Sequence, residues 1–259
     1  MEPIYDGMQT YNAPSYSFLI GHETSGSKLI LDLGVAKSWR RMMSIEDVKE
    51  LTELSGIGIG VKKDVAEVLE KHRVDPSCIT FIVYSHHHYD HVGDPSTFPT
   101  STSIVVGPGF VKACLPGYPD DPSSEFLYDA EKNKGREIIE LNFDPSTSKH
   151  ICLVIGGFEA IDFFGDGSFF LLDAPGHTIG HVSALLRTTS DASGESTFVL
   201  LGGDIAHHAS VFRPSQHLPF PEVISPSHSA NLSMQDRRNA LERCSHNIIT
   251  GTMKQMGKA

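Results

Sequence analysis

Short apolar runs separated by polar turns make up the first part of the chain. The stretches 15–22 and 28–34 are rich in β-forming residues and flank a polar, glycine-containing turn, a pattern that predicts a hairpin. Apolar residues then recur at helical spacing over 44–54 and over 62–74. Two strands followed by two helices are therefore expected, with Ser44 as the N-cap of the first helix.

The end of the second helix leads into the most apolar strand of the chain. Val65, Val68 and Leu69 fall on one face of that helix, which we expect to be its buried face. The segment 78–84, "CITFIVY", is then almost wholly apolar, as is typical of a strand that is buried on both faces.

Strand-like and helix-like runs continue to alternate after this strand. A strand is predicted at 102–108, a short helix at 109–115 and a surface loop at 116–126. Five further strand-like runs lie at 136–141, 158–164, 168–177, 182–189 and 197–204. Because the composition does not change along the chain, we predict one layered α/β domain over residues 1–259, with an atypical part from about residue 228.

The composition of the chain argues against several classes of function. The chain has 21 basic and 32 acidic residues and a net charge of −11, which argues against binding nucleic acid. Its apolar runs are too short to span a bilayer, and its first residues lack an apolar leader, so a cytoplasmic protein that does not bind membranes is expected. The four cysteines lack CxxC spacing, which predicts reduced, mostly buried thiols and no cysteine-based zinc site.

Residues 85–91, "SHHHYDH", directly follow the apolar strand and gather four imidazoles and a carboxylate. Successive side chains of an extended segment point to opposite sides, so His86 and His88 are expected to face one way and His87 the other. Asp90 and His91 follow, where the chain must turn. This H-x-H-x-D-H pattern favours a metal site over a solvated histidine-rich loop.

Two further strand ends carry similar chemistry. "FFLLDAPGHTIGH" brings His177 after a Pro-Gly turn, and "FVLLGGD" brings Asp204 after a pair of glycines. Taken alone, the first is a common turn and the second a common cap. Together with residues 85–91 they supply imidazoles suited to zinc and a carboxylate able to bridge two ions.

These three motifs, in this order and each after an apolar strand, resemble the metallo-β-lactamase superfamily over roughly residues 15–210. The resemblance implies a four-layer αββα sandwich with two metal ions between the sheet edges. It implies that His86, His88 and His177 bind the first ion, that Asp90 and His91 bind the second, and that Asp204 bridges them. Asp32 and Asp173 each end a strand and could orient ligating imidazoles, although capping of a helix or loop explains them as well. His181 would anchor the turn after His177.

The last ligand of two-metal members is less clear in this sequence. Such members usually carry a final histidine after a late strand, whereas here His246 and His228 are the candidates and neither follows an apolar strand. Without that ligand, the second ion should bind less tightly. His207 occupies the place of a tyrosine that aids the substrate carbonyl in some lactone-opening members, and its imidazole could protonate the leaving group. A surface histidine pair with His208 explains it equally well.

The resemblance favours a zinc-dependent hydrolase that opens a lactone or a related cyclic or acyl ester, with water activated by the metals as nucleophile and Asp90 and His207 as catalytic residues. The Pro- and Phe-rich segment 211–227 could form an apolar substrate pocket. Alternatives are a thioester hydrolase like glyoxalase II, a γ-lactam hydrolase, an iron-binding oxidoreductase and a non-catalytic metal-binding protein. Two zinc ions per chain are expected, with iron or manganese as alternatives, and the sequence does not predict the oligomeric state.

Overall fold

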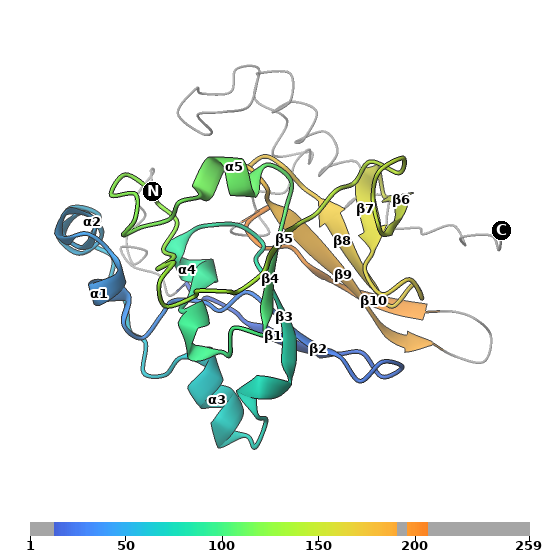
Figure 1. Cartoon of the computed structure of the whole chain (residues 1–259), viewed down its shortest axis with the longest axis horizontal. Coiled ribbons are helices and arrows are strands. Elements are labelled where there is room, and N and C mark those ends of the chain that lie inside the picture. Colours follow the sequence, from blue (N-terminus) through green and yellow to red (C-terminus); the bar gives the residue numbers. More distant parts are fainter. Residues whose placement is uncertain (1–12, 191–195, 207–259) are drawn as a thin grey trace, which may run out of the picture.

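The computed structural model describes residues 13–190 and 196–206, which form two five-stranded sheets packed face to face (Figure 1). The first sheet has the order β1-β2-β3-β4-β5 and contains β1 (Phe18–Gly21), β2 (Lys28–Leu31), β3 (Ile79–Val83), β4 (Ser103–Val106) and β5 (Ile138–Glu140). The second has the order β10-β9-β8-β7-β6 and contains β6 (Ile151–Ile155), β7 (Phe158–Asp162), β8 (Phe169–Asp173), β9 (Val182–Ser190) and β10 (Ser196–Leu201).

The predicted hairpin opens the first sheet. β1 and β2 pair antiparallel. The next three pairs, β2 with β3, β3 with β4 and β4 with β5, are parallel. Parallel neighbours need crossover connections, and helical segments lie within them. These are α1 (Trp39–Met42), α2 (Ile45–Lys49), the π-helical turn η1 (Glu50–Leu54), α3 (Val65–Lys71), the 3₁₀ turns η2 (Pro76–Cys78) and η3 (Pro95–Thr97), α4 (Tyr89–Val92) and α5 (Phe110–Cys114).

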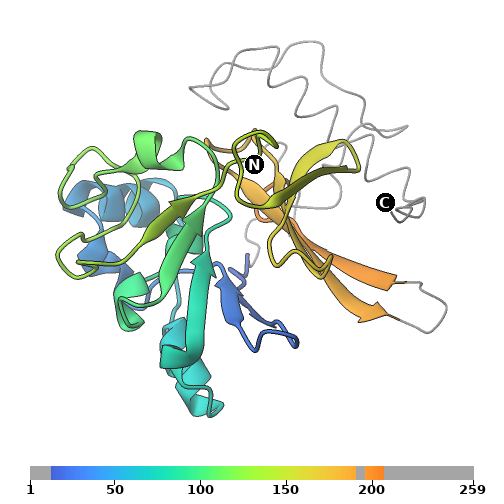
Figure 2. The ribbon, with the colours of Figure 1, turned by 45° about the vertical axis from the view of Figure 1, so that its right-hand side comes forward.

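The central strands of the first sheet are buried on both faces, as the apolar run at 78–84 predicts for β3. Ile82 and Ile104 point to the face covered by helices, where they pack with Trp39 and Phe110. The alternate residues, such as Val83, point into the core between the two sheets. Figure 2 shows the helices on the outer side of this sheet and the second sheet on its inner side.

The second sheet is antiparallel throughout and supplies the other half of that inner core. Phe169, Leu171 and Val182 are fully buried between the sheets. Its first strand, β6, is an addition to the predicted strands. The run "ICLVI" is apolar, but Ile151 is 58% exposed and Val154 is 69% exposed, as is typical of a strand at a sheet edge.

Helix α3 corrects one detail of the sequence pattern. Val68 was predicted to share the buried face of this helix with Leu69, but its side chain is 42% exposed. Ala66 takes its place in the core. The small alanine, spaced three residues before Leu69, lets the helix approach the sheet, which turns Val68 toward solvent.

A buried guanidinium ties the loop before β4 to the end of the first sheet. Arg136 is 7% exposed and donates hydrogen bonds to the carbonyl oxygens of Pro95, Phe98, Pro99 and Thr102. Its Nε donates to the Asn133 side chain at 3.0 Å. The carbonyl oxygens of Pro95 and Pro99 also accept the backbone N–H groups of Phe98 and Thr102, so Arg136 reinforces these turns and holds the segment that follows the metal-ligand motif.

Two predictions about surface residues also need correction. His22 has no metal-ligand spacing in the sequence and is expected to be a surface residue. Its side chain is instead 9% exposed, its ring stacks on Phe164 at 4.1 Å and its Nε2 lies 2.9 Å from Asp166 Oδ2. It therefore links the turn after β1 to the turn after β7. Of the three cysteines in the described residues, Cys114 is buried, Cys152 is half-buried and Cys78 is exposed, so the thiols are not mostly buried.

One predicted layer of helices is not found in the described part of the chain. Its helices all lie between β2 and β5 in the chain, so the helical layer predicted beyond the second sheet is not among residues 13–190 and 196–206. No helix of these residues is long and apolar enough to cross a bilayer.

Candidate metal centre

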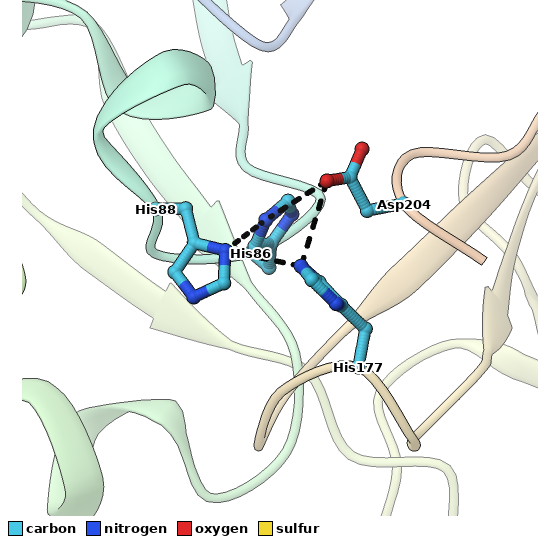
Figure 3. A group of neighbouring side chains, drawn as sticks. All are labelled: His86, His88, His177 and Asp204. Carbon is cyan, nitrogen blue, oxygen red and sulfur yellow. Dashed lines mark hydrogen bonds and ion pairs between the residues drawn. The ribbon is translucent and has the colours of Figure 1, made fainter. Parts of the chain in front are cut away.

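Four of the predicted ligands come together at one edge of the sandwich. His86 and His88 follow β3, His177 follows β8, and Asp204 follows β10 (Figure 3). Each of these strands ends at the same edge, so residues 118 positions apart in sequence become neighbours. One donor atom from each side chain lies within 4.8 Å of the other three.

The three imidazoles are arranged around a common centre. His88 Nδ1 lies 3.0 Å from both His86 Nε2 and His177 Nε2. Asp204 Oδ2 lies 3.5 Å from His177 Nε2 and 3.9 Å from His86 Nε2. Ligands bound tetrahedrally to zinc at about 2.0–2.1 Å are separated by roughly 3.3 Å, so this donor set fits such an ion.

The predicted second group lies on the other side of Asp204. His91 Nε2 is 3.2 Å from Asp204 Oδ1 and 3.8 Å from Asp90 Oδ2. The two oxygens of Asp204 thus face different groups of donors. This arrangement suits a carboxylate placed between two cation positions.

Burial keeps the first group of imidazoles neutral. His86 is fully buried, and desolvation followed by the nearby imidazoles of His91 and His181 lowers its pKa far below the ordinary value. Desolvation also lowers the pKa of His88. Because a neutral imidazole has a free lone pair, these side chains are ready to bind a metal without first losing a proton.

His91 has the opposite electrostatic setting. Desolvation opposes its protonation, but hydrogen bonds to Asp204 and Asp32, with the charges of both, outweigh that effect and raise its pKa to about 10. In the metal-free protein, His91 is therefore a cation held between two carboxylates. Its Nδ1 lies 2.8 Å from Asp32 Oδ2.

Asp32 acts as predicted, orienting a histidine of the motif, and it does so together with a residue that the sequence reasoning missed. Ser85 donates to the Asp32 carboxylate through both its backbone N–H and its hydroxyl, each at 2.7 Å. The Ser85 oxygen also lies 3.0 Å from His86 Nδ1, where it can accept the ring proton and leave Nε2 free. Only its place directly before the H-x-H motif could have indicated this role.

The side chain of His181 bonds both the turn that carries His177 and the backbone of Asp204. Its Nδ1 donates to the carbonyl oxygen of Ala174 at 3.1 Å, and its Nε2 accepts the backbone N–H of Asp204 at 3.0 Å. Complete burial lowers its pKa to about 3, so it remains the neutral tautomer that both bonds require. Gly203 must be a glycine here, because its φ is +56° and a Cβ would lie 2.8 Å from His181 Nε2.

The other predicted residues divide into two groups. His87 is not one of the four clustered donors, in line with the predicted alternation, and its Nε2 lies 3.5 Å from Oε2 of Glu125, an acidic residue that no sequence motif marks. Asp173 ends β8, and its predicted orienting role stays a prediction. His207, His208, His228, His246 and the segment 211–227 lie outside the described residues.

With the fold and this cluster in place, the comparisons with known proteins identify the class. The family model described as the metallo-beta-lactamase superfamily matches residues 11–191. The chain belongs to this superfamily, and the predicted sandwich fold is confirmed. The metal-binding character predicted from the three motifs agrees with this membership.

Curated relatives narrow the comparison. The chain is 45% identical over 237 residues to Gamma-lactamase FDB1 of Fusarium pseudograminearum, an alignment that covers 89% of this chain and 54% of the relative. It is 44% identical over 201 residues to Gamma-lactamase MBL2 of Gibberella moniliformis, covering 77% of this chain and 79% of that protein. The chain thus spans about half the length of the first of these relatives.

A solved structure supports the fold. The structure of a B. thuringiensis AiiA mutant with N-decanoyl-L-homoserine bound at its active site matches with a TM-score of 0.55 at 20% identity. The match covers 92% of this chain and 77% of that one. At this level of identity the likeness concerns the fold.

Proposed function

We propose that this chain is a metal-dependent hydrolase that opens a small cyclic amide, a γ-lactam. The observation that carries the proposal is the convergence of His86, His88, His177 and Asp204 on one centre. The two relatives named γ-lactamases favour a lactam over the lactone expected from the sequence alone. Lactone opening stays a prediction and forms the second arm of the test.

Zinc is the proposed metal, because three imidazoles and a carboxylate form a donor set that zinc prefers. His86, His88 and His177 would hold one ion, Asp90 and His91 a second, and Asp204 would lie between them. Iron or manganese would fit the same donors less selectively. Elemental analysis of the purified chain tests both the metal and the number of ions, and the His246→Ala variant tests whether that residue binds the second ion.

The proposed reaction adds one water across the ring C–N bond, giving a carboxylate and an amine. A bound divalent cation would supply Lewis acidity toward the ring carbonyl and make water more acidic. The chain's own contribution is to hold neutral imidazoles and one carboxylate in a fixed arrangement, through Ser85, Asp32 and His181. Preorganised donors need no rearrangement during the reaction.

Two residues are proposed to handle protons or to contact the substrate. The Asp90 side chain is 36% exposed while remaining close to His91, so it can reach a bound ring from the edge of the site. His207 is proposed to deliver the proton to the leaving nitrogen, with the His207→Ala variant as its test. A loss of turnover without a loss of bound metal would support this role.

The substrate class is tested by supplying the metal-loaded chain with a γ-lactam, a γ-lactone and a glutathione thioester. Mass spectrometry would detect a ring-opened product heavier by one water from the lactam or the lactone, and free glutathione with a carboxylic acid from the thioester. Faster opening of the lactam, measured as kcat/KM, supports the proposal. Turnover of the lactone alone, or of the thioester alone, contradicts it.

The remaining proposals concern the protein as a whole. Residues 1–259 are proposed to form one domain that acts on a small molecule in the cytoplasm and binds neither nucleic acid nor membranes. The net charge of −11 supports the first of these exclusions.

A further inference from the structure

A second group of polar side chains lies beside the metal-ligand cluster and shares one of its histidines. Donor atoms of His87, His88 and Glu125 lie within 4.8 Å of one another. His87 Nε2 is 3.5 Å from Glu125 Oε2, whereas His87 Nδ1 is buried and has no hydrogen-bond partner among the described residues. His87 therefore interacts with this group through Nε2.

The loop that carries Glu125 is firmly packed although the carboxylate itself is exposed. The neighbouring Phe126 is 1% exposed and packs edge-on against Phe110 with ring centroids 5.0 Å apart. The Phe126 carbonyl accepts the backbone N–H of Tyr118 at 2.8 Å. The side chain of Glu125 is 80% exposed, so it can adjust its position above the two histidines without moving this loop.

The two groups make incompatible demands on His88. Its Nδ1 is the nitrogen that lies 3.0 Å from His86 Nε2 and from His177 Nε2. A neutral imidazole has one lone-pair nitrogen and one N–H, so a lone pair on Nδ1 places the proton on Nε2. Figure 3 shows this second ring nitrogen of His88 pointing away from the other three side chains.

A neutral His88 therefore cannot bind cations in both groups at once. The cluster with His86 and His177 has the shorter distances and includes a fully buried donor, whereas the group with Glu125 ends in an exposed carboxylate. The second group is better suited to accept a proton donor than to hold a metal. Metal-ligating histidines commonly donate their other N–H to a carboxylate, which fixes the tautomer and strengthens the ligand.

We propose that Glu125 is a positioning residue, whose carboxylate accepts the Nε2–H of His88 and thereby presents the Nδ1 lone pair to the metal. The inference rests on the metal site of the proposed function and concerns affinity for the metal rather than the choice of substrate. The proposal also accounts for the position of His87, because its Nε2 lies beside the same carboxylate.

The test is a zinc titration of the metal-free full-length chain against a chromophoric chelator. Glu125→Ala is expected to weaken zinc binding by about 10–100-fold, the usual effect of removing such an acceptor. Glu125→Gln should weaken it less, because the amide oxygen still accepts the N–H. Glu131→Gln, an exposed glutamate 86% accessible at its side chain, is the matched control and should bind zinc like the wild type.

Two further readouts separate positioning from ligation or from a folding defect. The number of zinc ions bound should be the same in all variants, and the metal-free proteins should unfold at the same temperature. A wild-type affinity in Glu125→Ala, the loss of one zinc equivalent in that variant, or a wild type that binds no zinc would each overturn the inference. Zinc binding in the expected order without lactam hydrolysis would contradict the proposed function alone.

Discussion

The two sheets contribute to the same cluster in different ways. The first sheet is mostly parallel, its central strands are buried on both faces, and it supplies His86, His88 and His91 from one continuous segment after β3. The second sheet is antiparallel and supplies single residues, His177 and Asp204, from two separate turns. The first half of the cluster depends on one short motif, whereas the second half depends on how accurately two turns are placed.

The supports of the two halves differ accordingly. The motif after β3 is held by side chains of its own sheet, because Asp32 lies at the end of the neighbouring strand β2 and bonds both Ser85 and His91. Asp204 is held by a contact within the second sheet, through the buried ring of His181. Variants of each half should therefore show whether the metal cluster fails by losing a donor, by losing the fold or by losing the position of a turn.

The largest effect on activity is expected from removing the carboxylate that faces both groups of donors. Asp204→Asn keeps the shape but loses the charge, and a loss of about 4 kcal/mol of transition-state stabilisation would lower kcat/KM about 10³-fold. The measurement is kcat/KM on the best substrate, with the metal content of the variant determined in parallel. An Asp204→Asn protein as active as the wild type would contradict the central position assigned to this residue.

The largest effect on stability is expected in the first sheet. Arg136→Met removes a buried guanidinium and its hydrogen bonds to four carbonyl oxygens, two of which keep a backbone donor, and this loss should cost about 3 kcal/mol of the free energy of unfolding. Urea denaturation measures this change. Arg41→Met, at an exposed position, is the control and should be close to neutral.

A smaller effect is expected at the turn that carries Asp204. Gly203→Ala forces an alanine into the left-handed region, which should lower the free energy of unfolding by about 1–2 kcal/mol. It also places the new Cβ 2.9 Å from the Cβ of Ser85. Because relief of this contact moves Asp204, zinc affinity should fall together with stability. Gly202→Ala is the matched control, since its Cβ would meet only the flexible side chain of Ile205.

In Gly202→Ala both quantities should change less than in Gly203→Ala. Equal effects of the two substitutions would show that the left-handed conformation at Gly203 does not position Asp204.

The smallest effect concerns the link between the two sheets at the opposite end from the cluster. Hydrogen bonds from His22 and then Ser168 lower the pKa of Asp166 from 3.8 to about 2. A carboxyl group whose pKa is lowered by folding stabilises the protein above its unfolded pKa and loses this contribution as the pH falls through the folded pKa. The contribution of such a partly exposed pair should be less than about 1 kcal/mol.

Asp166→Asn removes the carboxyl group and with it the pH dependence of this contribution to stability. The difference in unfolding temperature between wild type and variant should be constant near neutral pH and should narrow as the pH falls from about 4 toward about 2. Calorimetry over this range measures it. A gap that widens on acidification would contradict the lowered pKa.

The sequence by itself determined the parts of this protein that depend on local pattern. The alternation of strand-like and helix-like runs indicated a layered α/β domain, and the H-x-H-x-D-H motif placed His86 and His88 on one side because an extended chain alternates its side chains. His177 and Asp204 were also identified, because each lies in a short motif directly after an apolar strand. In each case the information lies within a few neighbouring residues.

Only the tertiary structure decided the contacts between distant segments. Ser85 and Glu125 carry no motif, and their roles arise because the fold brings Asp32 and His88 beside them. The exposure of Val68 was likewise set by how closely α3 packs, which its helical spacing does not reveal. The physical reason is that a periodic pattern specifies which face of an element is buried, whereas the partner on the other side of that face comes from elsewhere in the chain.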